Sequence, residues 1–109
     1  MSINNVKAFD AEAIRDTSDH TSTVVFNGEF IIKTLIIENG LNQTVSFQCE
    51  GSSDAAFTNK FDIGGSWDVT GTTNTFQTCD TYIPYWRVIA TCGTAPTTGA
   101  LTLIVLGVH

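Results

Sequence analysis

The side chains that could do acid–base or metal chemistry are few in this sequence, and they do not form a catalytic pattern. His20 lies in a polar stretch and His109 is the final residue, so neither has the sequence context of a metal ligand or a general base. Two pairs of carboxylates lie close enough in the sequence to share a cation: Asp62 with Asp68, and Glu50 with Asp54. Such pairs are more often solvated at a surface. The sequence contains no nucleophile elbow, H-E-x-x-H zinc motif, P-loop or EF-hand loop. We therefore expect no catalytic residue, no metal site and no cofactor, and a protein that is not an enzyme.

The three cysteines, Cys49, Cys79 and Cys92, do not indicate a disulfide framework or a zinc site. Their number is odd and no two are spaced as a C-x-x-C pair. Unpaired cysteine behaves as a small hydrophobic residue, so buried free thiols are expected. A Cys49–Cys92 bridge stays open as an alternative, if strands bring the two residues together.

Four aromatic residues raise the alternative of a sugar-stacking platform: Trp67, Tyr82, Tyr85 and Trp86. Adjacent residues of a strand face opposite sides of the sheet, so Tyr85 and Trp86 cannot both join one flat platform. Packing in the core is the expected role of Trp86. A carbohydrate-binding module therefore stands as the alternative of a different functional class.

The elements that would position these residues are short strands. β-branched and aromatic runs separated by turn residues extend from Ser22 to the end of the chain, without helical periodicity. The better-defined expected strands cover residues 22–26, 30–37, 43–49, 85–92 and 100–108. Asn27-Gly28 predicts a tight hairpin between the first two, and shorter strands that cross between sheets are expected between residues 50 and 81. This pattern predicts an all-β fold: an antiparallel two-sheet sandwich, or a jelly roll.

Residues 1–21 have a different texture, with scattered apolar side chains that follow neither period. We expect an extended N-terminal arm over residues 1–21 and a β-sandwich domain over residues 22–109. Val6, Phe9 and Ile14 are the side chains that would attach the arm. An isolated polar segment cannot offset its own ordering entropy, so the arm would dock on a neighbouring subunit or on its own domain.

Two expected strands are apolar on both faces, which is unusual for an antiparallel sheet with one face in water. In residues 30–37 and 101–108, both alternating sets are apolar. The second faces must be covered, either by the same chain or by another subunit. We expect a homotrimer or homodimer, because closed symmetric oligomers are the usual outcome. Its interface would use Ile31, Leu35, Ile37, Ile104 and Leu106.

Composition and charge exclude some classes of partner. The chain has 109 residues, of which 42% are hydrophobic and 15% charged, and its formal net charge is −6. This is the composition of one folded domain. The basic residues are scattered: Lys7, Arg15, Lys33, Lys60 and Arg87. Nucleic-acid binding needs clustered basic side chains, so no nucleic-acid partner is expected. No apolar stretch has the length of a signal peptide or a membrane span, so we expect synthesis in a cytoplasm and no membrane partner.

Two stretches resemble segments of small tailed-phage virion proteins. They are residues 36–51, IIENGLNQTVSFQCEG, and residues 84–107, PYWRVIATCGTAPTTGALTLIVLG. In those proteins a strand–N-x-x-Q–strand hairpin precedes a terminal hairpin of the type P-Y-x-R-V-x-A-x…A-P-x-x-G-x-L-T.

The resemblance implies a capsid decoration, or cement, protein with a β-sandwich fold. Such a protein would bind the major capsid protein on the outside of the shell and would be located in the virion. The resemblance also places Arg87 near a contact between subunits, with a carboxylate-paired arginine inside the fold as the alternative. A tail or baseplate accessory protein is the second reading within virions.

Overall fold

The structure is a computed structural model that describes residues 3–26, 32–79 and 83–108. Its strands are β1 (Ile3–Glu12), β2 (His20–Thr21), β3 (Val25–Phe26), β4 (Ile32–Asn39), β5 (Val45–Ser52), β6 (Phe61–Val69), β7 (Thr73–Cys79), β8 (Tyr85–Cys92) and β9 (Leu101–Val108). The described residues include no helix of the length and apolarity that a membrane crossing requires. The expected all-β fold is confirmed.

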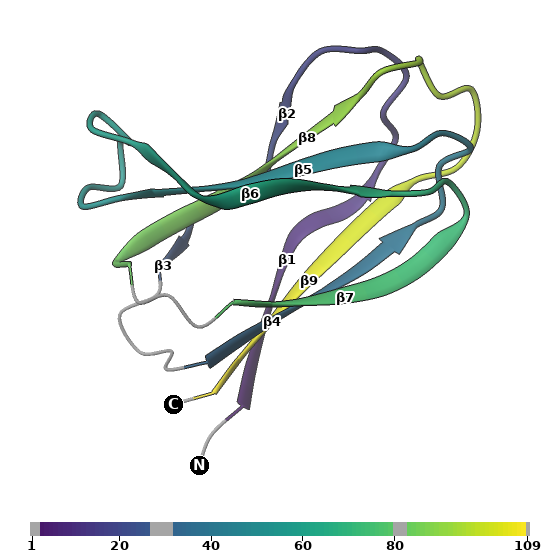
Figure 1. Ribbon diagram of the computed structural model, residues 1–109. Helices are drawn as coiled ribbons and strands as arrows, with labels where there is room; N and C mark the ends of the chain where they lie inside the picture. The colour runs from purple at the N-terminus through teal and green to yellow at the C-terminus, as the bar shows by residue number, and fades with distance from the viewer. Residues whose placement is uncertain (1–2, 27–31, 80–82, 109) are drawn as a thin grey trace.

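The strands form two antiparallel sheets that pack face to face (Figure 1). The first sheet has the order β1-β9-β4-β7, and the second has the order β2-β8-β5-β6, with β3 also paired to β8. Successive strands pass from one sheet to the other, as from β4 to β5, β6 to β7 and β8 to β9. This is the strand order of a jelly roll, in which two Greek keys interleave.

The strand crossings correct the expected hairpin at Asn27-Gly28, a dipeptide that lies outside the described residues. A hairpin would pair β3 with β4 in one sheet. Instead β3 pairs with β8 in the second sheet, and β4 lies between β9 and β7 in the first. The turn dipeptide indicates a reversal of direction, but it does not determine whether the next strand pairs locally or crosses the sandwich.

The N-terminal segment is extended, as expected, but it is part of the sandwich from Ile3 onward. β1 pairs antiparallel with β9 along its length, with register shifts on either side of Phe9. Phe9 and Ile14 are buried in the core of the same chain. The sequence left open whether residues 1–21 dock on a neighbouring subunit or on their own domain. In the structure, β1 and Ile14 pack on their own domain. The boundary expected at residue 21 therefore does not separate a free arm from the body.

The core lies between the sheets and is built from the inward side chains of both. Alternation in β5 and β8 buries Val45, Phe47, Val88 and Ala90, while their neighbours are only partly buried. Each large side chain buried in this way contributes about 1.5–3 kcal/mol. One inward position is charged: Lys33 is 1% exposed, and its Nζ lies 5.7 Å from the centroid of the Trp86 ring.

The loops at one end of the sandwich are held by a buried amide and by a close backbone contact. The Asn39 amide donates to the carbonyls of Gln43, Val69 and Thr70, and its Oδ1 accepts from the Leu41 N–H. Gly99 has a φ of 86°, and a Cβ there would collide with the backbone of Gly40. These contacts fix where β4 and β9 begin to run side by side, and so fix their register.

Candidate functional site

The outer face of the first sheet is built by the register of β9, β4 and β7. Ile104 lies opposite Ile36, and Ile36 lies opposite Phe76, so these three side chains form a row across the sheet. Opposed residues of antiparallel strands share a face. Leu106, two residues farther along β9 on the same face, lies beside these three and opposite Thr34. We call Ile36, Phe76, Ile104 and Leu106 the apolar row.

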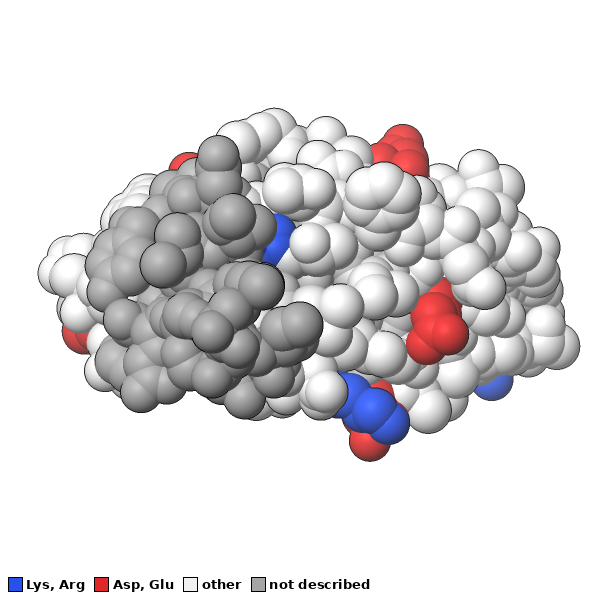
Figure 2. Space-filling view, turned by 90° about the horizontal axis from the view of Figure 1, so that it is seen from below, with Lys and Arg blue, Asp and Glu red and all other residues white. Residues whose placement is uncertain are grey.

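The apolar row is open to solvent, as judged from the described residues. Phe76 is 68% exposed, and Ile36, Ile104 and Leu106 are partly buried by their neighbours in the sheet. Figure 2, a view from below, shows a few charged side chains, among them one basic and acidic pair in contact, with uncharged surface between them. An exposed aromatic side chain within a row of aliphatic ones is a feature of surfaces that bind other proteins.

The outer face of the second sheet is polar and internally bonded. The Ser46 hydroxyl donates to Asp68 Oδ1 at 2.6 Å. Glu50 accepts from Arg87 Nε at 2.9 Å, and Lys60 Nζ lies 3.3 Å from the other carboxylate oxygen of Glu50. The Arg87 guanidinium also lies 4.2 Å from the centroid of the Phe57 ring. Arg87 is therefore an intramolecular, carboxylate-paired arginine, the alternative that the sequence left open.

The structure separates the five residues expected at the oligomer interface. Ile104 and Leu106 belong to the apolar row. Leu35 and Ile37 do not: both are fully buried between the sheets, so their place in the expected interface is wrong. Ile31 lies outside the described residues. The physical reason is that residues alternate faces along a strand, and the outward set of β4 is the one that contains Ile36.

The three side chains expected to attach the arm to a capsid all point into their own domain. Val6 is opposite Val105 and packs against the core, and Phe9 and Ile14 are buried. The expectation that these three side chains contact a shell is therefore wrong, because they pack against the core of their own chain.

Sequence reasoning missed Ile36 and Phe76 as surface residues of interest. Phe76 lies between residues 50 and 81, where turn residues obscure the alternation. The sequence predicts short strands in this region without defining their bounds. The available signal was the uncharged run from Thr73 to Cys79, in which a single aromatic residue stands among polar ones.

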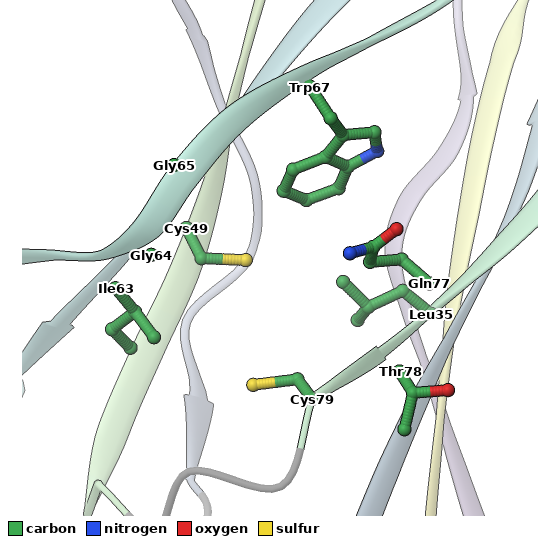
Figure 3. A pocket seen from close by; sticks show the side chains of 9 residues that line it. All are labelled: Leu35, Cys49, Ile63, Gly64, Gly65, Trp67, Gln77, Thr78 and Cys79. Atoms are coloured by element: carbon green, nitrogen blue, oxygen red, sulfur yellow. The ribbon is translucent and has the colours of Figure 1, made fainter.

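A cavity of about 220 Å³ lies between the sheets, on the side of the two edge strands β6 and β7. Figure 3 shows the thiols of Cys49 and Cys79 reaching into it from opposite sheets, below the indole of Trp67. Burial raises the pKa of the Cys49 thiol to about 12, with a smaller contribution from Cys79. A nucleophilic cysteine needs a thiolate near neutral pH, and this environment favours the thiol.

The remaining titratable groups make local contacts. His20 Nε2 lies 2.8 Å from Asp16 Oδ1, and hydrogen bonds from His20 and then from Ser18 hold the pKa of Asp16 below its ordinary value. Asp54 accepts from the Ser52 hydroxyl at 2.6 Å, which lowers its pKa. No group of three or more His, Cys, Asp or Glu side chains with metal-binding geometry occurs among residues 3–26, 32–79 and 83–108.

The aromatic residues do not form a flat platform in the described part of the chain. Trp86 is buried in the core, as expected. Trp67 points inward and stacks on Phe47, with ring centroids 5.5 Å apart. Tyr82 lies outside the described residues. Cys49, Cys79 and Cys92 are free thiols, so the Cys49–Cys92 bridge is not formed.

No protein-family model and no curated protein matches this sequence. Among solved structures, the crystal structure of PirA is similar, with a TM-score of 0.48 and 12% sequence identity. The match covers 98% of this chain and 82% of that chain. At this level the likeness carries no argument about function.

Proposed function

We propose that this protein is a non-enzymatic structural component of a virion, a capsid decoration protein that works as a small homo-oligomer. It attaches to the major capsid protein through the outer face of the first sheet. The observation that carries the proposal is the apolar row on that face, with Phe76 68% exposed.

The energetic support comes from the contrast between the two outer faces. Side chains of the second sheet already satisfy one another, as in the Glu50–Arg87 pair, so docking there would break existing bonds. Docking on the apolar row removes apolar surface from water, at about 25 cal/mol per Å². Two charged residues border the row on the same face: Lys7 lies opposite Ile104, and Glu38 is the next outward residue of β4 after Ile36. The first sheet is therefore the more favourable binding face.

The resemblance to phage virion proteins falls on the strands that build this face. Residues 36–51 run from β4 into β5, and residues 84–107 cover β8 and most of β9. β4 supplies Ile36, and β9 supplies Ile104 and Leu106. The stretches thus overlap the apolar row on β4 and β9, whereas β5 and β8 belong to the second sheet and Phe76 lies outside both stretches. Each stretch crosses from one sheet to the other rather than forming the hairpin that the resemblance implies.

The mechanism is linkage between binding and assembly. A protein that binds the assembled lattice more tightly than its free subunits stabilises the lattice by mass action. An oligomer that attaches at more than one point multiplies weak contacts by avidity. This mode of action requires no bond to be made or broken.

The test is co-sedimentation of the purified protein with shells assembled from the major capsid protein of the same genome. Ile104→Asp places a charge in the apolar row and should weaken binding by about thirtyfold, the effect of losing one central interface contact. The matched control is Ile89→Asp, which changes a partly buried isoleucine of β8 on the opposite outer face. It should leave binding within about threefold of the wild type.

Three results would overturn the proposal. One is a genome without a capsid protein, another is a wild-type protein that stays in the supernatant, and the third is equal weakening by the two aspartates. Binding to tails rather than to shells would favour the alternative function, a tail or baseplate accessory protein.

A further inference from the structure

The four free edges of the two sheets differ in how they are protected against pairing with another strand. An unpaired strand edge is a template for association, and proteins block it with charges, bulges, prolines or short strands. The edge strand β1 carries Lys7, Asp10 and Glu12 and has two register shifts. At the edge of the second sheet that pairs with β8, β2 and β3 have only two residues each.

The edge strand β6 is blocked by charge and by backbone irregularity. It carries Asp62 and Asp68, and its pairing with β5 shifts register between Phe47 and Cys49. Within it, Gly64 has a φ of 68°, outside the range of a regular strand. Three of the four edges thus carry a recognised protection.

The edge strand β7 carries none of these protections. Its residues, Thr73–Cys79, contain no charge, no proline and no glycine, and they pair with β4 without a register shift. The side chains from Thr73 to Thr78 are exposed on both faces of the strand. Among the described residues, β7 pairs with β4 alone, so its outer row of backbone groups is available.

We propose that β7 is a strand-addition site, and that its occupant is β7 of a second copy of this chain, paired antiparallel about a two-fold axis at Phe76. The first sheets of the two copies then form one continuous eight-stranded sheet. This inference specifies the self-association within the proposed function and rests on it only for the existence of an oligomer.

The uncharged edge of β7 permits a second copy as the occupant. Each chain carries a formal net charge of −6, so two copies repel unless they meet where charges are absent. In the two-fold arrangement Thr75 faces Gln77 of the second copy, and Asn74 faces Thr78. No charged side chain of β7 opposes another. Of the three longer edge strands in the described residues, β1, β6 and β7, only β7 carries no charged side chain, so a contact there sets no like charges opposite each other in any register.

Continuity of the outer face supports the same geometry. Phe76 is the central residue of β7 and lies on the outer face, so the two Phe76 side chains meet at the axis. Cross-strand aromatic pairs stabilise a sheet, and this one would cover the most exposed large apolar side chains of the described residues. The two apolar rows then join into one continuous surface.

The test is sedimentation velocity of the full chain over a range of concentrations. Thr75→Lys with Gln77→Lys sets like charges opposite each other across the axis, and the dimer dissociation constant should rise by at least roughly tenfold. Thr75→Lys with Gln77→Glu sets opposite charges there and should keep the constant within about threefold of the wild type. Thr75 and Gln77 do not lie on the outer face, so both variants leave the apolar row intact.

The charge control is Thr94→Lys with Thr98→Lys, two exposed positions in the loop before β9. It should leave the dimer unchanged. Hydrogen exchange gives a second measurement, because amides of β7 should become protected as concentration rises.

Equal behaviour of the two β7 variants overturns the inference, and so does a wild-type monomer at all concentrations. A dimer that Ile104→Asp dissociates but the lysine pair does not is formed by the outer face; this result overturns the inference and leaves the proposed function standing. β7 amides protected only when shells are added assign the edge to another protein. A dimer that behaves as expected but does not bind shells overturns the proposed function alone.

Discussion

The two outer faces of this jelly roll are both exposed to solvent, but their outward side chains differ: those of the second sheet are largely polar and bonded to one another, and those of the first sheet include a row of apolar groups. On the second sheet, Ser46 bonds Asp68 and Glu50 bonds Arg87, so the polar groups are satisfied within the chain. On the first sheet, Ile36, Phe76 and Ile104 meet in a row without covering groups among the described residues. The polar groups of the second face are paired within the chain, whereas the first face leaves apolar side chains in contact with solvent; that the first face binds a partner is our proposal.

Among residues of the two outer faces, the largest expected effect on stability is at Glu50. This residue is 8% exposed, and Glu50→Gln removes the charge that faces Arg87 and Lys60. The free energy of unfolding should fall by about 2 kcal/mol, less than for a fully buried pair because Arg87 and Lys60 reach solvent. Urea unfolding measures the change. Glu38→Gln, at an exposed position on the first sheet, is the matched control and should shift it by less than about 0.5 kcal/mol. Equal losses would mean that the two faces do not differ in internal pairing.

A smaller effect is expected at Ser46, whose hydroxyl bonds Asp68 on the neighbouring strand. Ser46→Ala should lower the free energy of unfolding by about 1 kcal/mol, the net value of one such hydrogen bond. On the first sheet, Thr34→Val changes an outward hydroxyl of β4 that lies opposite Leu106. The free energy of unfolding of this variant, measured by thermal unfolding, should lie within about 0.5 kcal/mol of the wild-type value. A greater loss at Thr34 than at Ser46 would reverse the comparison.

The smallest effect on stability is expected at Phe76, in the centre of the apolar row. Phe76→Ser removes a side chain that is 68% exposed in the folded chain, so monomer stability should change by less than about 0.5 kcal/mol. The control Phe47→Ser, at a fully buried aromatic, should cost more than about 3 kcal/mol. Unfolding at a concentration where the protein is monomeric separates the two. A large loss at Phe76 would mean that its ring supports the fold rather than a contact.

The local pattern predicted most of the fold. Clean alternation in residues 45–49 predicts β5, which has one dry face and one wet face, and the β-branched and aromatic run after Pro84 predicts β8. The same signal failed for β4, where both alternating sets are apolar. Leu35 and Ile37 were expected outside and lie inside, because hydrophobicity does not distinguish two apolar faces. The register with β9 shows which face is which: Ile37 lies opposite the buried Leu103, and Ile36 lies opposite Ile104 on the other face.

The candidate site was predicted in part, and the reason is again register. Ile104 and Leu106 were expected at an oligomer interface; they lie on the outer face and are partly buried, and the interface itself stays a prediction. Phe76 was not, because its exposure depends on β7 being the last strand of its sheet. Strand order is a non-local property, set by crossings between sheets that leave no mark on the residues of β7.

The sequence by itself determined the class of fold, the scarcity of groups for chemistry and the excess of apolar side chains on two strands, because these follow from composition and from period-two patterns along the chain. Only the tertiary structure decided that β3 and β4 lie in different sheets, that β1 pairs with β9 at the edge of the first sheet, and which set of apolar side chains faces outward. These outcomes depend on contacts between residues far apart in the chain, where burial of one face of β4 against the second sheet leaves the other to the surface.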